Sequence, residues 1–542
     1  MWAWLFLTLL TLAVFASIVG AEVVAMQKTG EIGTNGHLYV TSKQLGNNGR
    51  LGNQLFQVAS TIAMGTHLRR EPVFSEWSYR DLFEDNPCFK SNTRALTHST
   101  RRTRSESHAY AFDDMFLKQR KKNLNVTGYR IHPRYFQAAS FDVRRALTLS
   151  KGMVAQVLSA LPAIRSCIGV HVRRGDYVGD SRYDICSTHY YQQGIKHFKK
   201  LAPEAPVIIV SDDKEWCRTA FPGYPISPFD SDKLDFICLS LCQYKVISNS
   251  TFAWWCAWLD VRFDSRVFAP SPWVNQSQWQ QGSDGLYLKD WTVFDTKSNR
   301  VRMSPQSDEP VELGAYYQCF KQREAFIGAC QAYRRVYPKA SLVIVSDDGD
   351  DFTSLARDFG AVYWRNDKRS GNGTTTEMSV RPTAELFVRN FLKGAHLIEQ
   401  KWFILLEDDV YVESCVHMGE VRADIVGNNT SNNGRTVFND RTQAYLRERG
   451  VTAKYYGGCG GSLFKTEFWR DLSLEGVMEN VKVFGELNDV YHSDMLLSFI
   501  CVANGGKIIN GQERFPSEFS EKRTEFGERP PAILHQFKQW YK

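Results

Sequence analysis

Short apolar runs followed by polar or charged residues recur along the chain and predict buried strands. The clearest run ends in two adjacent arginines, and two others end in Ser-Asp-Asp. Segments with helical spacing lie between them. Strands that alternate with helices and carry polar groups at their ends are typical of an α/β sheet that binds ligands at its carboxyl edge. The predicted strands are Ile168–Val172, Val207–Asp213, Lys245–Ile247, Leu342–Asp348 and Trp402–Val410, and the predicted helices include Phe141–Leu161, Leu234–Leu241, Phe320–Tyr337 and Pro382–Ile398.

A segment at positions 297–311 interrupts this pattern, because it contains Pro, Ser and mixed charge and has no apolar period. We interpret it as an interdomain linker. The chain of 542 residues is long enough for more than one folding unit. The sequence therefore predicts one α/β domain at 37–296 and a second at 312–542.

The N-terminal run Met1–Ala21 is apolar and uncharged, and a short polar stem follows at 22–36. Such a run is either a cleaved secretory signal or a signal-anchor. The small residues at Val19–Ala21 resemble a cleavage site, whereas the length of the run favours an anchor. An anchor predicts a single-pass type II protein of the Golgi membrane with lumenal catalytic domains. Cleavage predicts a secreted protein.

Composition narrows the function classes further. The formal net charge of +7 is modest and is spread along the chain, so nucleic acid is not expected as a partner. The 12 cysteines include no C-x-x-C pair, which argues against structural zinc. Entry into the secretory pathway favours disulfides among some of them.

The sequence IGVHVRRGDY at Ile168–Tyr177 is the first candidate site. Arg173 and Arg174 follow the predicted strand directly, and Gly175 permits a close turn. Two guanidinium groups at the end of a strand suit a doubly charged anion such as a diphosphate. The alternative is a surface Arg–Asp pair, with Asp176 as the acid.

Two further segments are candidates for the same anion. A glycine loop with Arg50 leads into a predicted helix at Asn53, and a glycine loop before a helix start is a common anion site. The alternative is a tight strand–helix turn. Hydroxyl and amide groups also precede a Trp-rich helix and are suited to phosphate or ribose, although an N-cap is equally compatible. These residues are Ser248, Asn249, Ser250 and Thr251.

The second domain has its own candidate chemistry. Its strand Trp402–Val410 runs into three acids, whose mutual repulsion a divalent cation relieves, and oxygen ligands suit Mg²⁺ or Mn²⁺. The alternative is an acidic turn. Asp494 is a candidate general base or an N-cap acid, and His535 is a candidate metal ligand or a structural histidine. The candidate metal ligands are Glu407, Asp408, Asp409 and His535.

The first domain resembles the α-1,2-fucosyltransferase family, which is glycosyltransferase family 11-like, across roughly residues 37–296. The matching motifs stand in the family's order. They are GRLGNQLFQVA at Gly49–Ala59, GYRIHPRYF at Gly128–Phe136, HVRRGDYV at His171–Val178, VSDD at Val210–Asp213, SNSTFAWWCAWL at Ser248–Leu259, AP-x-x-W at Ala269–Trp273 and Asp290-Trp291.

The resemblance implies a GT-B-like enzyme that uses GDP-L-fucose without a metal and inverts the sugar's configuration. Arg173 and Arg174 would hold the diphosphate, His171 would shape the site, and Asp176 would position the arginines or act as the base. The segment Ser248–Thr251 would line the donor phosphates. Arg50 and Asn53 would lie in the facing N-terminal loop.

The second domain resembles a GT-A glycosyltransferase, with Glu407, Asp408 and Asp409 binding manganese at an unidentified nucleotide sugar. The predicted protein is thus a bifunctional glycosyltransferase whose acceptor is a glycan that ends in a β-galactoside. One alternative makes the C-terminal domain an inactive carbohydrate-binding or scaffolding module. A second alternative, a secreted lectin, is disfavoured by Arg173 and Arg174, because neutral sugars do not need paired guanidinium groups.

Overall fold

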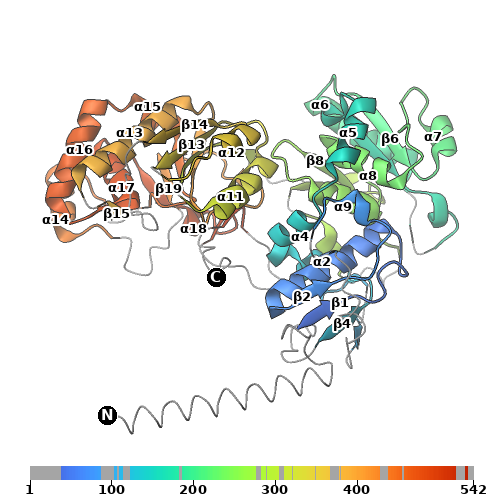
Figure 1. The fold of residues 1–542 in the computed structure, drawn as a ribbon. Helices are drawn as coiled ribbons and strands as arrows, with labels where there is room; N and C mark the ends of the chain where they lie inside the picture. Colours follow the sequence, from blue (N-terminus) through green and yellow to red (C-terminus); the bar gives the residue numbers. More distant parts are fainter. Residues whose placement is uncertain are drawn as a thin grey trace, which may run out of the picture. The chain divides into compact units, whose positions relative to one another are not determined.

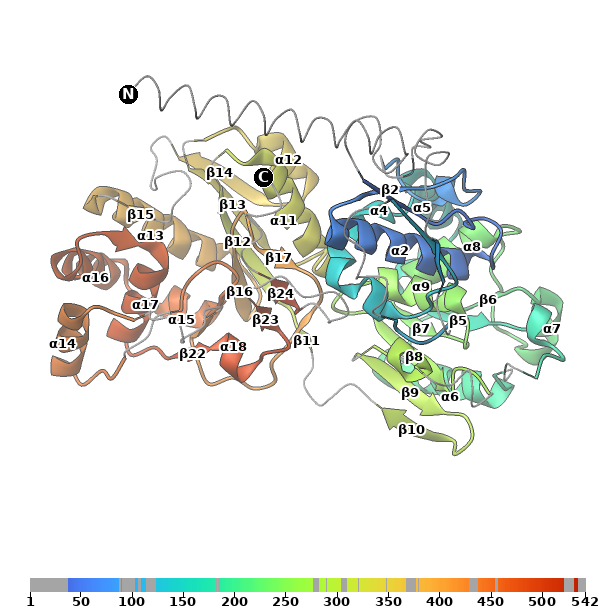
Figure 2. The same ribbon diagram turned by 90° about the horizontal axis from the view of Figure 1, so that it is seen from below.

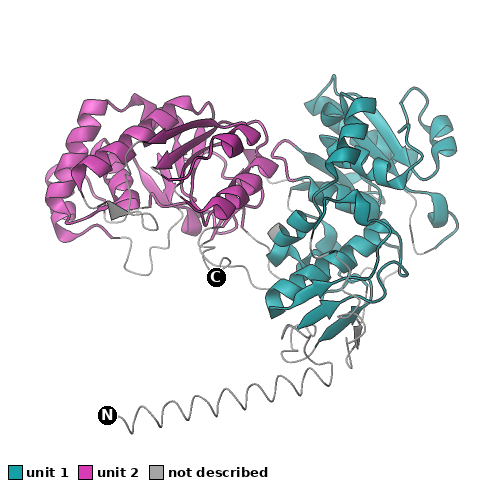
Figure 3. Ribbon diagram, viewed as in Figure 1, with its two compact units in different colours: residues 1–260, 265–305, 525–529 teal, residues 261–264, 306–524, 530–542 magenta. Residues whose placement is uncertain are grey.

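The protein divides into two compact units in the computed structural model (Figure 3). Unit 1 comprises Met1–Asp260, Ser265–Pro305 and Glu525–Arg529, and unit 2 comprises Val261–Asp264, Gln306–Thr524 and Pro530–Lys542. The structure describes residues 38–86, 89, 103–105, 109–113, 123–181, 183, 186–275, 282–288, 290–303, 310–319, 321–347, 349–366, 377–378, 380–427, 437–453, 457–520 and 531–534. The predicted anchor at Met1–Ala21 and the stem lie outside these residues.

Unit 1 begins with a small parallel sheet in the order β2-β1-β4-β3 (Figure 1). A long helix, α2, follows β1 and returns the chain to β2. The strands are β1 (Tyr39–Thr41), β2 (Glu71–Val73), β3 (Thr103–Ser105) and β4 (Leu124–Thr127), and α2 spans Leu51–Leu68.

A second sheet of six strands completes unit 1, in the order β10-β9-β8-β7-β5-β6. All neighbours are parallel except β9 and β10. The chain passes from β5 to β6 on one side and then to β7 on the other, so the sheet has a topological switch point between β5 and β7. The strands are β5 (Ile168–Val172), β6 (Val207–Ser211), β7 (Tyr244–Val246), β8 (Arg266–Ser271), β9 (Trp291–Asp295) and β10 (Arg300–Met303).

Side chains alternate along each buried strand, so both faces of this sheet are apolar, and helices cover both of them. Ile168, Val170 and Val172 pack on one face with α6 (Thr188–Leu201) and α7 (Lys214–Ala220). Ile208 and Val210 face the opposite core, which includes α8 (Asp232–Leu241) and α9 (Thr251–Leu259). Two further helices of unit 1 are α4 (Ser140–Ala146) and α5 (Lys151–Ala160).

The two sheets of unit 1 share one aromatic core. Helices α2 and α9 pack against each other, and they lie side by side in both ribbon views (Figures 1 and 2). The ring of Phe56 in α2 lies 4.8 Å from Trp254 and 5.0 Å from Trp255 in α9, measured between centroids. A Cβ atom at Gly52 would lie 2.4 Å from the backbone nitrogen of Phe252, so only glycine permits this approach.

Unit 2 contains a seven-stranded sheet in the order β14-β13-β12-β16-β20-β19-β22. Only β20 is antiparallel to its neighbours. From β12 the chain passes to β13 and β14 on one side and returns to β16 on the other, which creates a second switch point. The strands are β12 (Leu313–Cys319), β13 (Leu342–Asp347), β14 (Val362–Asn366), β16 (Trp402–Leu406), β19 (Ile425–Gly427), β20 (Leu463–Lys465) and β22 (Ile508–Asn510).

Helices again form layers on both faces of the sheet in unit 2. Tyr317 packs with Phe326 of α11 in one core, whereas Tyr316 packs with Phe391 of α13 in the other. Short paired strands flank the sheet. The helices are α11 (Arg323–Val336), α12 (Thr353–Asp358), α13 (Arg381–Leu397), α14 (Asp440–Glu448), α15 (Thr466–Asp471), α16 (Leu474–Leu487), α17 (Ser493–Ala503) and α18 (Gly511–Arg514), and the short pairs are β11 (Pro310–Val311) with β18 (Val416–His417), β15 (Glu377–Met378) with β21 (Tyr491–His492), and β17 (Tyr411–Val412) and β23 (Phe519–Ser520) with β24 (Ile533–Leu534).

Three predictions from the sequence can be compared with the structure. The predicted linker range 297–311 contains β10, which pairs with β9 instead of running free. Among the described residues, no helix is both long and apolar enough to cross a membrane. Disulfides are expected among some of the cysteines, without a predicted pairing. Several of the described cysteines are free and buried: Cys167, Cys217, Cys238, Cys256, Cys319, Cys330 and Cys501.

Candidate functional site

A cavity of about 800 Å³ lies in unit 1 at the carboxyl end of β5. Its size is within the usual range for small-molecule sites. Four segments that are distant in sequence contribute to its wall: the loop and first turn of α2, the loop after β5, the end of β6 and the start of α9. Its lining includes Gly49–Asn53, His171, Arg173, Asp176, Tyr177, Val210–Asp213 and Ser250–Phe252.

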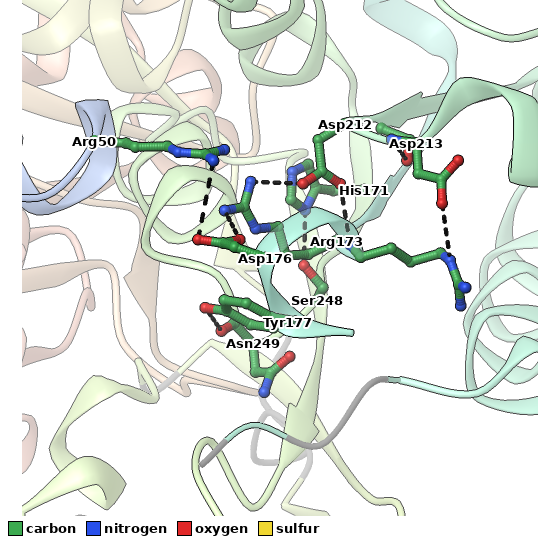
Figure 4. A network of polar contacts seen from close by, with 11 residues as sticks. Arg50, His171, Arg173, Asp176, Tyr177, Asp212, Asp213, Ser248 and Asn249 are labelled. Atoms are coloured by element: carbon green, nitrogen blue, oxygen red, sulfur yellow. Dashed lines mark hydrogen bonds and ion pairs between the residues drawn. The ribbon is translucent and has the colours of Figure 1, made fainter. Parts of the chain in front are cut away.

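Arg173 points into this cavity and is held by two carboxylates (Figure 4). Its Nη1 lies 2.8 Å from Oδ2 of Asp212, and its Nη2 donates to Oδ1 of Asp176. The other Asp176 oxygen, Oδ2, lies 4.0 Å from Nη2 of Arg50. Two guanidinium groups from different loops therefore share the Asp176 carboxylate at the cavity wall.

Arg174 has different surroundings from Arg173. Its Nε lies 3.2 Å from Oδ2 of Asp213, and its guanidinium carbon lies 4.0 Å from the Trp216 ring centroid. Arg174 is not among the described residues that line the cavity. The sequence predicts that both arginines hold one anion. In the structure the chain turns at Arg174, whose backbone is not extended, and of the two arginines Arg173 alone lines the cavity.

Asp212 fixes the turn after β5. Its Oδ1 accepts a hydrogen bond of 3.0 Å from the backbone N–H of Arg174. A Cβ atom at Gly175 would lie 2.3 Å from Asp212 Oδ2, so glycine is needed for this approach. The sequence analysis located the acids after β6 but assigned them no role. Parallel pairing of β5 with β6 was the available signal, because it brings both strand ends to one edge.

His171 and Ser248 connect the two strands at the switch point. Nδ1 of His171 and Oγ of Ser248 are 2.7 Å apart, and both side chains are buried. Phe252 stacks on the imidazole, with ring centroids 5.3 Å apart. Burial, with a smaller contribution from the charge of Arg173, lowers the pKa of His171 to about 3. The imidazole is therefore neutral at physiological pH.

The residues before α9 have two roles: some support the fold and others line the cavity. Asn249 donates from Nδ2 to the Trp273 carbonyl at 3.0 Å, and neither it nor Ser248 is among the described residues that line the cavity. Ser250 and Thr251 do line it. The Thr251 hydroxyl donates to Oδ1 of Asn53 at 2.8 Å, which joins the starts of α9 and α2.

Both of these helix starts open onto the cavity. Arg50 precedes α2 and Ser250 precedes α9, and within the described residues neither side chain caps its helix by a hydrogen bond. The first N–H groups of a helix have no partner within that helix and carry a partial positive charge. Two helix starts and two guanidinium groups thus give this wall an affinity for anions.

An acidic wall, which the sequence analysis missed, faces the same cavity. Lys214 donates to the carbonyls of Ser227 and Phe229 and lies 3.5 Å from Oδ2 of Asp235. Burial raises the pKa of Asp235 to about 6, although hydrogen bonding from Ser227 and the charge of Lys214 oppose the rise. Carboxylates accept hydrogen bonds from hydroxyl and N–H groups of a neutral ligand portion. The acids of this wall are Asp230, Asp232 and Asp235.

In unit 2 the predicted acids follow β16, beside the switch point. The Tyr317 hydroxyl on β12 donates to Oδ1 of Asp408 at 2.6 Å. A Cβ atom at Gly460 would lie 2.6 Å from Cδ of Glu407. Burial, and to a smaller degree the negative charge of Glu407, raises the pKa of Asp494. The charge of Glu407 thus acts on Asp494, and the common site of these acids stays a prediction.

The described residues do not fit a complete metal site. No group of three or more His, Cys, Asp or Glu side chains among them is arranged to hold a metal ion. Asp409 is buried, and the Tyr317 hydroxyl relieves part of the negative charge on Asp408. His535 lies outside the described residues, so its predicted role stays a prediction.

Comparisons with known proteins bear on the first unit. Residues 36–295, less than half of the chain, match the family model "Glycosyl transferase family 11". An alpha-1,2-colitosyltransferase of Escherichia coli is 28% identical over 171 residues, which are 29% of this chain and 59% of that relative. The chain therefore spans less than two thirds of this relative's length.

Two further comparisons each cover part of the chain. Galactoside alpha-(1,2)-fucosyltransferase 2 of Oryctolagus cuniculus is 26% identical over 280 residues, which are 47% of this chain and 71% of the relative. The crystal structure of fucosyltransferase NodZ from Bradyrhizobium aligns at 15% identity and a TM-score of 0.28, and the match covers 41% of this chain and 92% of that one. Residues 36–295 thus have their sequence relatives among glycosyltransferases of family 11.

Proposed function

We propose that unit 1 transfers L-fucose from GDP-L-fucose to a hydroxyl of a galactoside, with α-1,2 linkage and inversion. One observation carries the proposal: Arg50, Arg173 and the starts of α2 and α9 converge on one cavity at a switch point. This combination suits the diphosphate of a nucleotide sugar. The match of residues 36–295 to glycosyl transferase family 11 supports the reaction class.

The chemistry requires the cavity to stabilise a leaving group. The acceptor oxygen bonds to the anomeric carbon of fucose while the bond from that carbon to the β-phosphate oxygen breaks. The bonding electron pair leaves with GDP, and the acceptor proton passes to a base. Arg173 faces the phosphate oxygens on which negative charge develops, so it stabilises the transition state more than the ground state. The carboxylate of Asp176, the base candidate from the sequence, faces Arg173 and Arg50, so we place it at the donor phosphates and leave the base unassigned.

Two parts of the proposal depend on the relatives' names. One relative is named as an α-1,2-colitosyltransferase and another as an α-(1,2)-fucosyltransferase. The transferred sugar could therefore be fucose or colitose, and we choose fucose. The galactoside acceptor is likewise taken from them. A comparison of GDP-fucose with GDP-colitose, using a β-galactoside acceptor, would decide the sugar.

The direct test offers GDP-fucose and a β-galactoside to the purified full chain in EDTA. We expect transfer by the wild type and almost none by Arg173→Ala. Arg145→Ala is a matched control, because Arg145 is exposed and pairs with Asp142 outside the cavity. Absence of transfer together with absence of GDP binding would refute the proposal. A lectin would bind the galactoside without binding GDP.

We further propose that unit 2 is a GT-A-like transferase for a second nucleotide sugar. The acids after β16, Gly460 beside Glu407, and half-buried Asp494 belong to the part of unit 2 that holds its switch point, where open α/β sheets bind ligands. The alternative is an inactive carbohydrate-binding or scaffolding module. Screening nucleotide sugars with and without Mn²⁺ distinguishes them: a transfer abolished by EDTA and by Asp494→Asn supports the enzyme, and glycan binding without transfer supports the module.

We also propose that Met1–Ala21 anchors the chain in the Golgi membrane. The support is the apolar, uncharged sequence of this segment. N-terminal sequencing of the protein after secretory expression tests it. A mature chain that starts after Ala21 would indicate cleavage and secretion.

A further inference from the structure

Asp176 occupies the position between the two cavity arginines that an anionic ligand would take. One carboxylate oxygen accepts from Arg173 and the other lies 4.0 Å from Arg50 (Figure 4). The side chains of Asp176 and Arg50 are 54% and 67% exposed, whereas that of Arg173 is 13% exposed. The contact thus lies at the solvent side of the site, where ligands enter.

The charges around this contact are already balanced without a ligand. Arg173 and Arg50 contribute two positive charges, and Asp176 and Asp212 contribute two negative ones. A diphosphate brings further negative charge to the same guanidinium groups. Placed beside an unmoved Asp176, it would meet like charge at close range, which opposes binding.

Asp212 is too firmly held to move aside. One oxygen accepts the backbone N–H of Arg174 at 3.0 Å, and the other lies 2.8 Å from Nη1 of Arg173. Asp176, by contrast, sits in the one-turn 3₁₀ helix Gly175–Tyr177, and its side chain is more than half exposed. A rotation of the Asp176 side chain would free Nη2 of Arg173 and Nη2 of Arg50, while Nη1 of Arg173 stays paired with Asp212.

We propose that Asp176 is an exchangeable counter-ion. In the donor-free protein it neutralises Arg173 and Arg50. The donor diphosphate replaces the carboxylate, and the carboxylate returns to the arginines as GDP departs. Asp176 is then a positioning residue that weakens GDP binding and accelerates product release. This inference rests on the proposed function, because it requires a diphosphate at these arginines.

The exchange predicts an unusual sign for a substitution in a binding site. Asp176→Asn removes the competing charge at nearly constant size, so we expect GDP to bind about tenfold tighter or more, which corresponds to about 1.4 kcal/mol. We expect KM for the donor and kcat to fall together, because product release slows. A residue that only holds Arg173 in place would give the opposite change in affinity.

The experiment measures GDP binding to the full chain by calorimetry, for the wild type, Asp176→Asn and Asp212→Asn. Tighter binding by Asp176→Asn and weaker binding by Asp212→Asn support the exchange. Equal or weaker binding by Asp176→Asn overturns it. If the wild type does not bind GDP, the proposed function itself fails, and the two failures are thus distinguishable.

A measurement on the wild type guards against misfolding of the variant. In a crystal structure with GDP bound, we expect phosphate oxygens to contact the Arg173 guanidinium. The Asp176 carboxylate should then lie more than about 4 Å from that guanidinium, beyond ion-pair distance. An intact Arg173–Asp176 pair with GDP bound would overturn the proposal.

Discussion

Nδ1 of His171 lies 2.7 Å from Oγ of Ser248, and this contact ties the end of β5 to the residues that follow β7. Arg173 follows His171 by two residues, and Ser250 begins the loop edge of the cavity two residues after Ser248. The contact therefore fixes two parts of the anion-binding wall relative to each other. Because both partners are buried, water cannot replace either one at low cost.

Ser248→Ala should destabilise the protein and impair transfer. The substitution leaves the buried imidazole nitrogen without its hydroxyl partner, which costs about 1–3 kcal/mol. Urea unfolding measures the loss. Ser166→Ala is the control, because Ser166 is exposed and its hydroxyl donates to the nearby Ala163 carbonyl, so a change within about 0.5 kcal/mol is expected. Equal effects of the two substitutions would contradict the structural role of the contact.

The stability of the protein should depend on pH through His171. Its pKa is lowered to about 3 in the folded protein, first by burial and then by Arg173, whereas an unperturbed histidine titrates near 6.5. Between these values the unfolded chain binds the proton and the folded chain does not, so stability rises with pH. The contribution is complete above about pH 6.5 and is lost as the pH falls towards 3, by about 1.4 kcal/mol per unit.

Comparison of wild type with His171→Gln isolates this contribution. Urea unfolding between pH 4 and pH 7 should show a shallower pH dependence for the variant. Buried His132, whose pKa is lowered to about 4 by burial and by Arg134, is present in both proteins and cancels. Identical slopes would mean that His171 does not titrate differently on unfolding.

Arg173→Ala and Arg174→Ala should differ although the residues are adjacent. Loss of Arg173 removes a guanidinium from the cavity, and we expect kcat/KM for the donor to fall about 10²- to 10³-fold. Loss of Arg174 breaks its contacts with Asp213 and Trp216, so we expect a lower Tm with less than about tenfold loss of transfer. Donor kinetics and thermal unfolding of both variants give the comparison. Equal kinetic losses would place both side chains at the anion.

Gly52→Ala should destabilise unit 1. The new methyl group would lie 2.4 Å from the backbone nitrogen of Phe252, so α2 and α9 must separate, at a cost of about 1–3 kcal/mol. Gly152→Ala in α5 is the control, because the nearest atom is 3.8 Å away and alanine favours helix. Chemical denaturation should show a loss for the first and no loss for the second.

The strands were predictable because their apolar runs are short and end abruptly. The predicted run Ile168–Val172 coincides with β5, and Val207–Asp213 contains β6 with its two terminal acids outside the strand. The predicted strand Trp402–Val410 is shorter in the structure, since β16 ends at Leu406, before the acids. Burying an unpaired carboxylate is costly, which favours a strand end before the acids at β6 and β16, although β13 continues to buried Asp347.

The separate directions of Arg173 and Arg174 were not predictable. They depend on which of the two acids that follow β6 lies beside each arginine, and on Trp216 in the next helix. Periodicity does not encode such contacts between strands. The acidic wall was not predicted for a similar reason. Lys214 and Asp235 are 21 positions apart in the sequence, and the folding of the chain after β6 brings them into contact. From the sequence alone, both residues would be placed on the solvent-exposed surface.

The contact at Gly52 has a further consequence for how unit 1 meets its ligand. Backbone atoms of α2 and α9 already lie against each other at the cavity, and Phe56 packs into the tryptophans behind them. A hinge between the two sheets would have to break this packing, so the anion-binding wall is preorganised. The conformational entropy of assembling it is lost during folding and not on each encounter with a donor, which leaves the small rotation of a surface side chain as the motion that binding requires.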